Sequence, residues 1–251
     1  ATTGMGAPAR QGLTADAVYS AAMKLDRFIA NHTPHSRQAA RLLVASGRVT
    51  VAGERVCDPR FDVDQFVAIR LDGALLQDRP ALFYMLHKPV GFLSATRDLQ
   101  HRTVLELFAP ELREQLHIGG RLDRGSSGLL MLTNDGSWSR RLTEPKIKLP
   151  KTYQVTTLRP ISSETAERFA AGIYMTTEQL TTSPAQLQQL GECTCRLTIY
   201  EGRYHQIKRM FAALDNEVVA LHRERIGEIA LDPALAAGEW RELTQAEIDT
   251  V

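Results

Sequence analysis

The chain has 251 residues, of which 43% are hydrophobic and 24% charged, and its formal net charge at pH 7 is +1. These values are typical of a soluble globular protein with one large domain, or a small domain followed by a larger one. They exclude a membrane-spanning helix, because no apolar run approaches the ~20 residues that such a helix needs. A charge of +1 also means that any nucleic-acid surface must be local.

The first 22 residues differ in composition from the rest of the chain. They are rich in Ala, Gly and Thr, they almost lack acidic residues, and they contain no apolar core of the secretory type. We expect residues 1–22 to be a leader or an expression remnant, with the folded protein beginning at Met23.

The three cysteines do not form a disulfide framework. Cys193 and Cys195 alternate in a strand-like run, so their side chains share a face and cannot easily bond to each other. Cys57 is far from both in the sequence. This cysteine usage indicates a reducing cytoplasm.

Residues 23–72 follow a pattern of two helices and a small sheet. Leu25, Phe28 and Ile29 recur at helical spacing, and Ser36 is placed to cap a second helix that ends at Gly47. The runs 48–56 and 67–71 then predict strand, turn, strand and a further strand. Residues 73–81, with Gly, Asp and Pro, are predicted to be a linker.

Within this segment, the run S-R-x-x-A-x-x-L followed by G-x-V-x-V resembles the S4 RNA-binding module. The resemblance implies that Arg37, Arg41 and Arg48, around the second helix, contact RNA. The charge balance alone is equally typical of a solvated helix face. The ordered motif favours the RNA-binding interpretation.

The stretch 119–136 is the most unusual in composition. Its glycine-rich, polar middle carries one carboxylate, Asp123, between Arg121 and Arg124. An apolar run, 129–132, follows directly and predicts a buried strand closed by a turn at 134–136. A carboxylate on a loop that enters a core strand is held rigidly and stays reachable, as catalytic groups often are. An isolated aspartate of this kind would more often cap a turn.

The rest of the chain from residue 82 alternates strands with a few helices, which predicts an α+β fold with a mixed or antiparallel sheet in a domain spanning 82–251. The predicted strands are 82–86, 129–132, 151–157, 193–200, 217–222 and 229–231. The predicted helices are 103–108, 138–142, 161–171 with Ser162 or Ser163 at its cap, one beginning within 203–211, and one beginning near Thr244.

Several of these segments together resemble the RNA pseudouridine synthases. The matching motifs are K-P-x-G at 88–91, G-R-L-D at 120–123 with a hydroxyl-containing turn at 126–128, and H-Q-I-K at 205–208. The resemblance implies a small S4-type domain followed by a catalytic domain, and an isomerase that converts uridine in rRNA to pseudouridine. The runs 201–214 and 221–227 are most similar to the branch that modifies bacterial 16S rRNA. Ser-Ser in place of Thr-Thr at the turn, and Asp215 in place of glycine, depart from the family pattern.

The same resemblance assigns three catalytic residues. Asp123 would be the essential carboxylate, which must be ionised to attack or stabilise the sugar carbon. Lys208 would be its basic partner, although a lysine there could equally contact phosphate. Tyr153 would stack on the extruded uracil and move a proton, where the alternative is a core tyrosine.

Further residues are expected to bind RNA. A flat guanidinium at Arg121 could fill the gap that the extruded base leaves, or clamp a phosphate. The other expected contacts are Arg203, His205, Gln206, Arg209, Arg223 and Arg225. Isomerisation oxidises nothing and adds no group, so we expect no cofactor and no metal, and the scattered histidines show no metal-ligand spacing.

The expected partner is therefore rRNA, 16S rRNA within an assembling small ribosomal subunit, bound by a cytoplasmic monomer with no membrane contact. Three alternatives stay open. They are a synthase for 23S rRNA, a ribosome-assembly protein that binds RNA without turnover, and a hydrolase that would release free uracil. The set of Asp123, Tyr153 and Lys208 argues against the binding protein, which needs none of the three.

Overall fold

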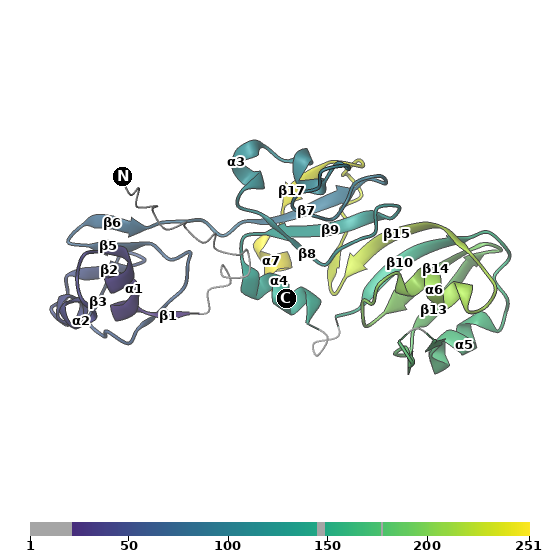
Figure 1. The fold of residues 1–251 in the computed structure, drawn as a ribbon, viewed down its shortest axis with the longest axis horizontal. Coiled ribbons are helices and arrows are strands. Elements are labelled where there is room, and N and C mark those ends of the chain that lie inside the picture. Colours follow the sequence, from purple (N-terminus) through teal and green to yellow (C-terminus); the bar gives the residue numbers. More distant parts are fainter. Residues whose placement is uncertain (1–21, 145–148, 177) are drawn as a thin grey trace, which may run out of the picture. The chain divides into compact units, whose positions relative to one another are not determined.

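The computed structural model describes residues 22–144, 149–176 and 178–251 (Figure 1). The chain divides into two compact units, one ending at Pro80 and one beginning at Ala81. The leader predicted for residues 1–22 lies outside the described residues except for its last position. No helix of the described residues is long and apolar enough to cross a membrane.

The first unit contains two short helices and a four-stranded sheet of strand order β3-β2-β5-β6. Its helices are α1 (Leu25–His32) and α2 (Arg37–Ala45). The strands of the sheet are β2 (Val49–Val51), β3 (Glu54–Val56), β5 (Ile69–Leu71) and β6 (Ala74–Gln77), and a separate pair is formed by β1 (Met23–Lys24) and β4 (Asp62–Val63).

Local sequence signals explain these elements. The Ser36 hydroxyl accepts a hydrogen bond from the Ala39 amide at 3.2 Å, which caps α2 as predicted. Gly47 ends the helix with φ +71°, a conformation that costs glycine little. The apolar stripes of both helices pack on Val49, Val51 and Ile69 in one core.

The segment 73–81, predicted as a linker, contains strand β6. Leu71 and Ala74 pair across a tight turn in which Asp72 and Gly73 have positive φ, so the strand continues the sheet of the first unit. The Asp, Gly and Pro residues are interpreted from the sequence as signs of a linker. In the structure they lie at this hairpin turn and after the end of the strand.

The second unit is built on a mixed sheet. In the part of the chain that the structure describes, this sheet has nine strands, in the order β13-β14-β10-β15-β9-β7-β17, with β8 beside β9 and β16 beside β15. Strands β9 and β15 run parallel, and the other described neighbours run antiparallel. The strands are β7 (Phe83–Lys88), β8 (His117–Gly119), β9 (Ser127–Thr133), β10 (Lys151–Thr157), β13 (Gln186–Gly191), β14 (Thr194–Ile199), β15 (Val218–Ile226), β16 (Ile229–Ala230) and β17 (Trp240–Glu242).

Helices lie on both faces of this sheet. They are the 3₁₀ helix η2 (Val104–Leu107), α3 (Pro110–Arg113), α4 (Gly136–Thr143), α5 (Thr165–Ala171), α6 (Gln206–Ala212) and α7 (Gln245–Ile248). A separate short pair is formed by β11 (Tyr174–Met175) and β12 (Leu180–Thr181). The prediction of an α+β fold with a mixed sheet is confirmed.

The central strand β9 is buried on both faces. Leu130 and Leu132 belong to the core that contains Phe169 and Phe211, whereas Leu129 and Met131 belong to a second core with Trp138. This arrangement explains the uninterrupted apolar run that the sequence shows here, because a strand covered on both sides has no solvated face to alternate with. The loop before β9 therefore runs directly into a strand that is buried on both faces.

Two further predictions differ from the structure, and several strands were not predicted. The helix predicted at 161–171 begins only at Thr165, because Ser162 Oγ accepts from the Glu164 amide within the preceding turn. Strand β15 continues four residues beyond His222, through Arg223 and Glu224. Strands β8, β11, β12, β13 and β17 were not predicted, since each is short or lacks a regular apolar alternation.

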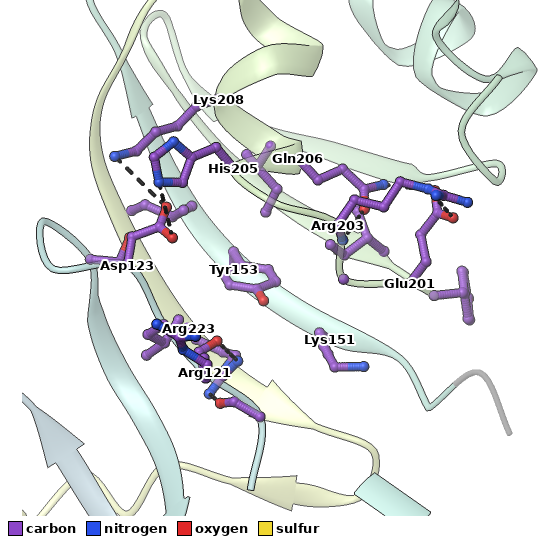
Figure 2. Close-up of a pocket in the computed structure, with 18 of the residues that line it drawn as sticks. Arg121, Asp123, Lys151, Tyr153, Glu201, Arg203, His205, Gln206, Lys208 and Arg223 are labelled. Atoms are coloured by element: carbon purple, nitrogen blue, oxygen red, sulfur yellow. Dashed lines mark hydrogen bonds and ion pairs between the residues drawn. The ribbon is translucent and has the colours of Figure 1, made fainter. Parts of the chain in front are cut away.

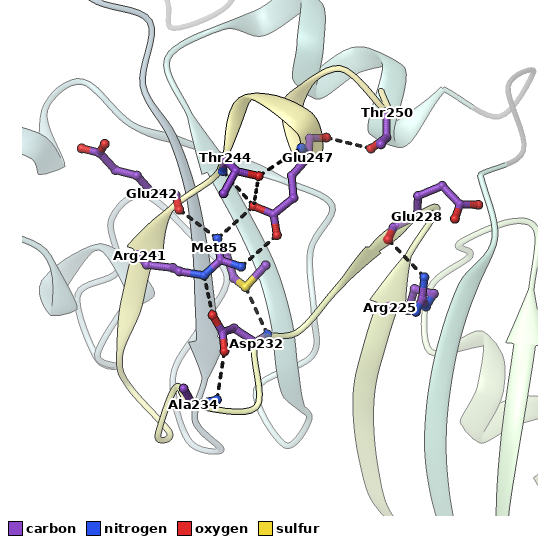
Figure 3. Close-up of polar contacts among 10 residues, drawn as sticks. All are labelled: Met85, Arg225, Glu228, Asp232, Ala234, Arg241, Glu242, Thr244, Glu247 and Thr250. Carbon is purple, nitrogen blue, oxygen red and sulfur yellow. Dashed lines mark hydrogen bonds and ion pairs between the residues drawn. The ribbon is translucent and has the colours of Figure 1, made fainter.

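Arg241 lies at the centre of a partly buried network of ion pairs in the last part of the chain (Figure 3). The Arg241 guanidinium donates to Asp232 Oδ2 at 2.7 Å and to both carboxylate oxygens of Glu247 at 2.8 and 2.9 Å. Glu247 also accepts from the Thr244 amide at 2.8 Å in the capping box of α7. The hydrogen bonds from Arg241, supported by that amide, lower the pKa of Glu247 to about 2.

We expect Glu247→Gln to lower the free energy of unfolding by about 1–3 kcal/mol at pH 7, since charge-assisted bonds are lost. The Glu247 pKa is depressed in the folded state, so this stabilisation is present above the ordinary pKa of about 4.5 and is lost as the pH falls toward 2. Urea unfolding of wild type and variant at pH 7 and pH 3 measures this pH-dependent difference in the free energy of unfolding. Glu228→Gln, an exposed carboxylate nearby, is the control. A difference between Glu247→Gln and wild type that does not shrink at pH 3 would contradict the assignment.

Candidate active site

The candidate site is built around the loop between β8 and β9 that carries Asp123. The Ser126 amide donates to the Asp123 carbonyl at 3.0 Å, which closes a turn around the aspartate. Upstream of it, the Ser94 hydroxyl donates to the Leu122 carbonyl at 2.7 Å, and the Leu122 amide lies 3.1 Å from the same hydroxyl. The main chain on both sides of Asp123 is thus fixed by hydrogen bonds.

A buried lysine supports the loop from β7. Lys88 is fully buried, and its ammonium donates to the carbonyl oxygens of Ser126 at 2.7 Å, Pro89 at 3.0 Å and Arg124 at 3.4 Å. Burial lowers the Lys88 pKa to about 8, and the neighbouring Asp123 carboxylate opposes that shift. Lys88 therefore positions the loop and also contributes positive charge behind the carboxylate.

Arg223, predicted as an RNA contact, has a different place. Its side chain is 1% exposed, and its guanidinium donates to the carbonyl oxygens of Leu129 and Gly120, both at 2.8 Å, and of Arg121 at 3.4 Å. These bonds hold the side chain inside the protein, where it lines the same cavity as Asp123. Arg223 is thus a clamp that ties β15 to both ends of the loop, and its contact with RNA stays a prediction.

The clamp requires a glycine at the start of β9. Gly128 pairs with Arg223 in the parallel register between β9 and β15, with φ +106°. A Cβ atom at Gly128 would lie 2.3 Å from the Arg223 carbonyl oxygen and 2.5 Å from its amide nitrogen. Since real Cβ contacts are never that short, only glycine allows the two backbones to approach this closely.

Two basic side chains face Asp123 from the loop before α6 and from α6 itself (Figure 2). His205 Nε2 lies 3.4 Å from Asp123 Oδ1, and Lys208 Nζ lies 3.9 Å from Asp123 Oδ2. The carboxylate is 28% exposed, so it is sheltered but reachable. The structure thus brings together Asp123 and Lys208, and it adds His205, which the sequence analysis placed among the RNA contacts.

The Asp123 carboxylate opens into a cavity of about 670 Å³, a size typical of sites for small ligands or single nucleotides. Tyr153, on β10, lines this cavity, and in Figure 2 its ring lies between the Asp123 group and Lys151. The ring is 6% exposed and the Arg223 guanidinium lies 6.0 Å from its centre. A planar, largely apolar wall therefore faces the carboxylate.

Other predicted RNA contacts near the cavity are engaged in ion pairs. Arg203 Nε lies 3.2 Å from Glu201 Oε2, and Arg209 pairs with Glu178 through both guanidinium nitrogens. The buried Gln206 amide donates to Glu201 Oε1 at 2.8 Å and accepts from the Arg203 amide at 3.0 Å. These bonds fix the loop beside the cavity and neutralise part of its positive charge.

The remaining predicted contacts lie at the cavity, on β15 or in the first unit. Arg121 is exposed at the mouth of the cavity, and Arg225 donates to the Glu228 carbonyl at 3.1 Å. In the first unit, Arg37 and Arg41 lie 3.1 and 2.8 Å from the buried Asp26 carboxylate, and Arg48 pairs with Asp72. Each of these three arginines is still about half exposed, so it can also face a phosphate.

Three residues around the loop were missed by the sequence analysis as contributors to the site: Lys88, Ser94 and Lys151. The K-P-x-G motif points to Lys88, but a lysine at the end of an apolar strand gives no sign that it is buried. Lys151 lines the cavity at the start of β10, and burial together with the Arg223 charge lowers its pKa. Within the described residues, no group of three His, Cys, Asp or Glu side chains is placed to hold a metal ion.

The chain is similar to known proteins over most of its length. Residues 83–213 match the family model of RNA pseudouridylate synthases, and residues 23–67 match the S4 domain. The chain is 53% identical to the ribosomal small subunit pseudouridine synthase A of Pseudomonas aeruginosa, over 91% of this chain and 100% of that protein. Identity to the Escherichia coli K12 protein of the same name is 45%, with the same coverage. A crystal structure of a pseudouridylate synthase is 40% identical, covers 91% of this chain and 99% of its own, and superposes with a TM-score of 0.67.

Proposed function

The chain belongs to the RNA pseudouridylate synthase family, and on that premise we propose that it isomerises a specific uridine of small-subunit (16S) rRNA to pseudouridine, with Asp123 as the catalytic carboxylate. Its near full-length likeness to two small-subunit synthases supports the rRNA target. The main evidence for the site is the placement of Asp123 at the cavity, where His205 and Lys208 both approach its carboxylate.

The reaction breaks the bond between N1 of uracil and C1′ of the ribose, turns the base, and joins C5 to C1′, while the C5 proton is lost and N1 gains one. A carboxylate is required where C1′ becomes electron-poor as the uracil leaves, either to attack it or to stabilise its charge. His205 and Lys208 hold Asp123 in the orientation that faces the cavity.

The walls of the cavity have the shape for an extruded base. Tyr153 offers a flat face on which uracil can stack, and its hydroxyl is a candidate for the proton transfer at C5. Arg121 lies at the mouth, where a guanidinium can occupy the gap that the base leaves in the RNA stack. Lys151 is a further cation that can contact a phosphate of the target nucleotide.

RNA is the partner of this protein, as both matched domains are RNA-directed. The finer assignments belong to the proposal: the first unit binds rRNA through Arg37, Arg41 and Arg48, the substrate is rRNA within an assembling small subunit, and the enzyme acts as a cytoplasmic monomer. Two ion pairs to Asp26 hold Arg37 and Arg41 on one side of α2, which supports a shared role for them.

Mapping pseudouridine on rRNA from cells with and without the gene tests the function. One uridine of 16S rRNA is expected to lose its modification in the deletion strain and to regain it when purified protein is added to the rRNA or to small-subunit particles. Loss at a 23S rRNA position would instead assign the target to the large subunit. Unchanged modification in both rRNAs would indicate that the protein binds RNA without catalysing a reaction. Release of free uracil would indicate a hydrolase.

A substitution at Tyr153 is expected to separate stacking from proton transfer. The phenyl ring of Tyr153→Phe keeps the face on which uracil lies, so RNA affinity is retained. Loss of the hydroxyl is expected to slow the chemical step by about 10²–10⁴-fold. Single-turnover rates at saturating protein isolate that step, and Tyr153→Leu, which loses the ring, is expected to impair binding as well. A Phe variant with the wild-type rate would reduce Tyr153 to a stacking surface.

A further inference from the structure

Tyr204, directly before His205, is an aromatic side chain that the proposed chemistry does not use. Its side chain is 77% exposed, the largest exposed fraction among the aromatic residues that the structure describes. A single exposed tyrosine is ordinary on a protein surface. Three further observations around Tyr204 distinguish it from such a residue.

The first is that Tyr204 is stacked on a residue of the active site. Its ring lies parallel to the His205 imidazole, with 3.9 Å between ring centroids and 16° between planes. The same imidazole approaches the Asp123 carboxylate through Nε2 at 3.4 Å. Tyr204 therefore covers one face of the His205 imidazole, which contacts Asp123. The opposite face of the Tyr204 ring is directed away from His205.

The second is that the backbone at the stacked His205 has an uncommon conformation. His205 has φ +49° and ψ +31°, in the left-handed region, which costs a residue with a Cβ roughly 1–2 kcal/mol. Strained backbone of this kind persists where the surroundings fix it, and it is concentrated at functional sites. Here the Arg209 guanidinium donates to the Tyr204 carbonyl at 3.4 Å, and Arg209 is itself fixed by Glu178. The ring is thus presented by an anchored loop.

The third is the charge around the ring. Arg203, the residue directly before Tyr204, has a side chain 40% exposed, and the Arg209 guanidinium lies 3.4 Å from the Tyr204 carbonyl oxygen. A flat aromatic face among cations matches unpaired nucleic acid, whose bases stack and whose phosphates are negative. An apolar protein segment would match the ring but not these cations.

We propose that Tyr204 is a stacking platform for an unpaired base of the RNA that flanks the target uridine. The inference rests on the proposed function, because extrusion of the uridine into the cavity leaves its neighbours without a stacking partner. The Tyr204 face, one ring away from the Asp123 contact, would take up one such neighbour. The His205–Tyr204 pair would then hold the carboxylate on one side and the RNA on the other.

The test uses the full-length protein carrying Asp123→Asn, so that in vitro transcribed small-subunit rRNA is bound but not converted. Dissociation constants are compared by filter binding for the Tyr204→Ala, Tyr204→Phe and Tyr174→Ala variants in this background. Tyr174→Ala is the matched control, because Tyr174 is also exposed, at 58%, and lies on strand β11, whereas Tyr204 is stacked on His205. Thermal unfolding is recorded for each variant.

Loss of one stacked base is expected to raise the dissociation constant of Tyr204→Ala by about 5–150-fold. Tyr204→Phe, which keeps the ring, is expected to stay within about threefold of its parent, as is Tyr174→Ala. An affinity of Tyr204→Ala within about twofold of its parent, with unchanged thermal unfolding, would overturn the inference. That result would leave the proposed function standing if protein with Asp123 intact still forms pseudouridine, whereas no product from the intact protein would overturn the function itself.

Discussion

Asp123→Asn is expected to lower the single-turnover rate of pseudouridine formation by at least about 10³-fold, which corresponds to about 4 kcal/mol in the barrier. The amide has nearly the size of the carboxylate, so the loop keeps its shape. It lacks the negative charge that the electron-poor sugar carbon requires. Because the amide also removes one negative charge near the RNA, affinity for rRNA is expected to be retained or to increase.

The measurement is product formation at saturating protein together with the dissociation constant for rRNA. Asp215→Asn is the control, because Asp215 is an exposed aspartate in the loop after α6 and its left-handed backbone suits asparagine equally well. A turnover of Asp123→Asn within about tenfold of the wild type would exclude Asp123 as the catalytic carboxylate.

Gly128→Ala is expected to have the largest effect on stability. The added Cβ would overlap the Arg223 backbone, with contacts of 2.3 and 2.5 Å, and the residue would have to keep φ +106° or force β9 and β15 apart. Backbone strain and overpacking together predict a loss of about 3–5 kcal/mol in the free energy of unfolding. For a unit of this size, that loss corresponds to roughly 6–20 °C in Tm.

The loss is measured by thermal and urea unfolding of the full chain, following the transition of the second unit. Gly125→Ala is the matched control on the same loop, since the nearest atom to its added Cβ is Lys208 Nζ at 4.0 Å, an ordinary contact. If Gly128→Ala unfolded at the wild-type temperature, β9 and β15 would not be packed as closely as the structure has them.

Much of the fold is predictable from the sequence where one periodicity dominates. The strand predicted at 151–157 is β10 over the same residues, because its buried positions alternate strictly. The side-chain hydroxyls of Ser36 and Thr244 accept hydrogen bonds from main-chain amides of the first turn, so these residues mark where their helices begin. The central strand β9 is predicted from the length of its apolar run and from the turn that follows it, although burial on both faces removes the alternation of apolar and polar residues.

The second half of β15 could not be predicted for a physical reason. Its residues 222–225 are His, Arg, Glu and Arg, a run that is typical of a solvated segment. Arg223 is buried in spite of its charge, because three main-chain carbonyls, two from the loop that carries Asp123 and one from β9, accept its hydrogen bonds. Those acceptors lie about a hundred residues away in the chain, and no local pattern indicates them.

The same limit applies to the candidate site. The motif around Asp123 identifies the carboxylate, and the family pattern identifies Lys208 and Tyr153. The approach of His205 to Asp123 and the support from Lys88 depend on how separate strands and α6 meet, which neither motif nor composition determines. Likewise, the ion pairs of Arg37 and Arg41 with Asp26 turn an apparently free basic cluster into a partly neutralised one.

The two buried cations behind the catalytic loop also bear on when the protein becomes active during its synthesis and folding. Lys88 comes from the first strand of the second unit and Arg223 from a strand near its end, and both donate to carbonyls of the same loop. The loop therefore reaches its final geometry only after distant parts of the chain have joined one sheet, a slow kind of contact to form. Synthesis must therefore be nearly complete before the first uridine can be converted.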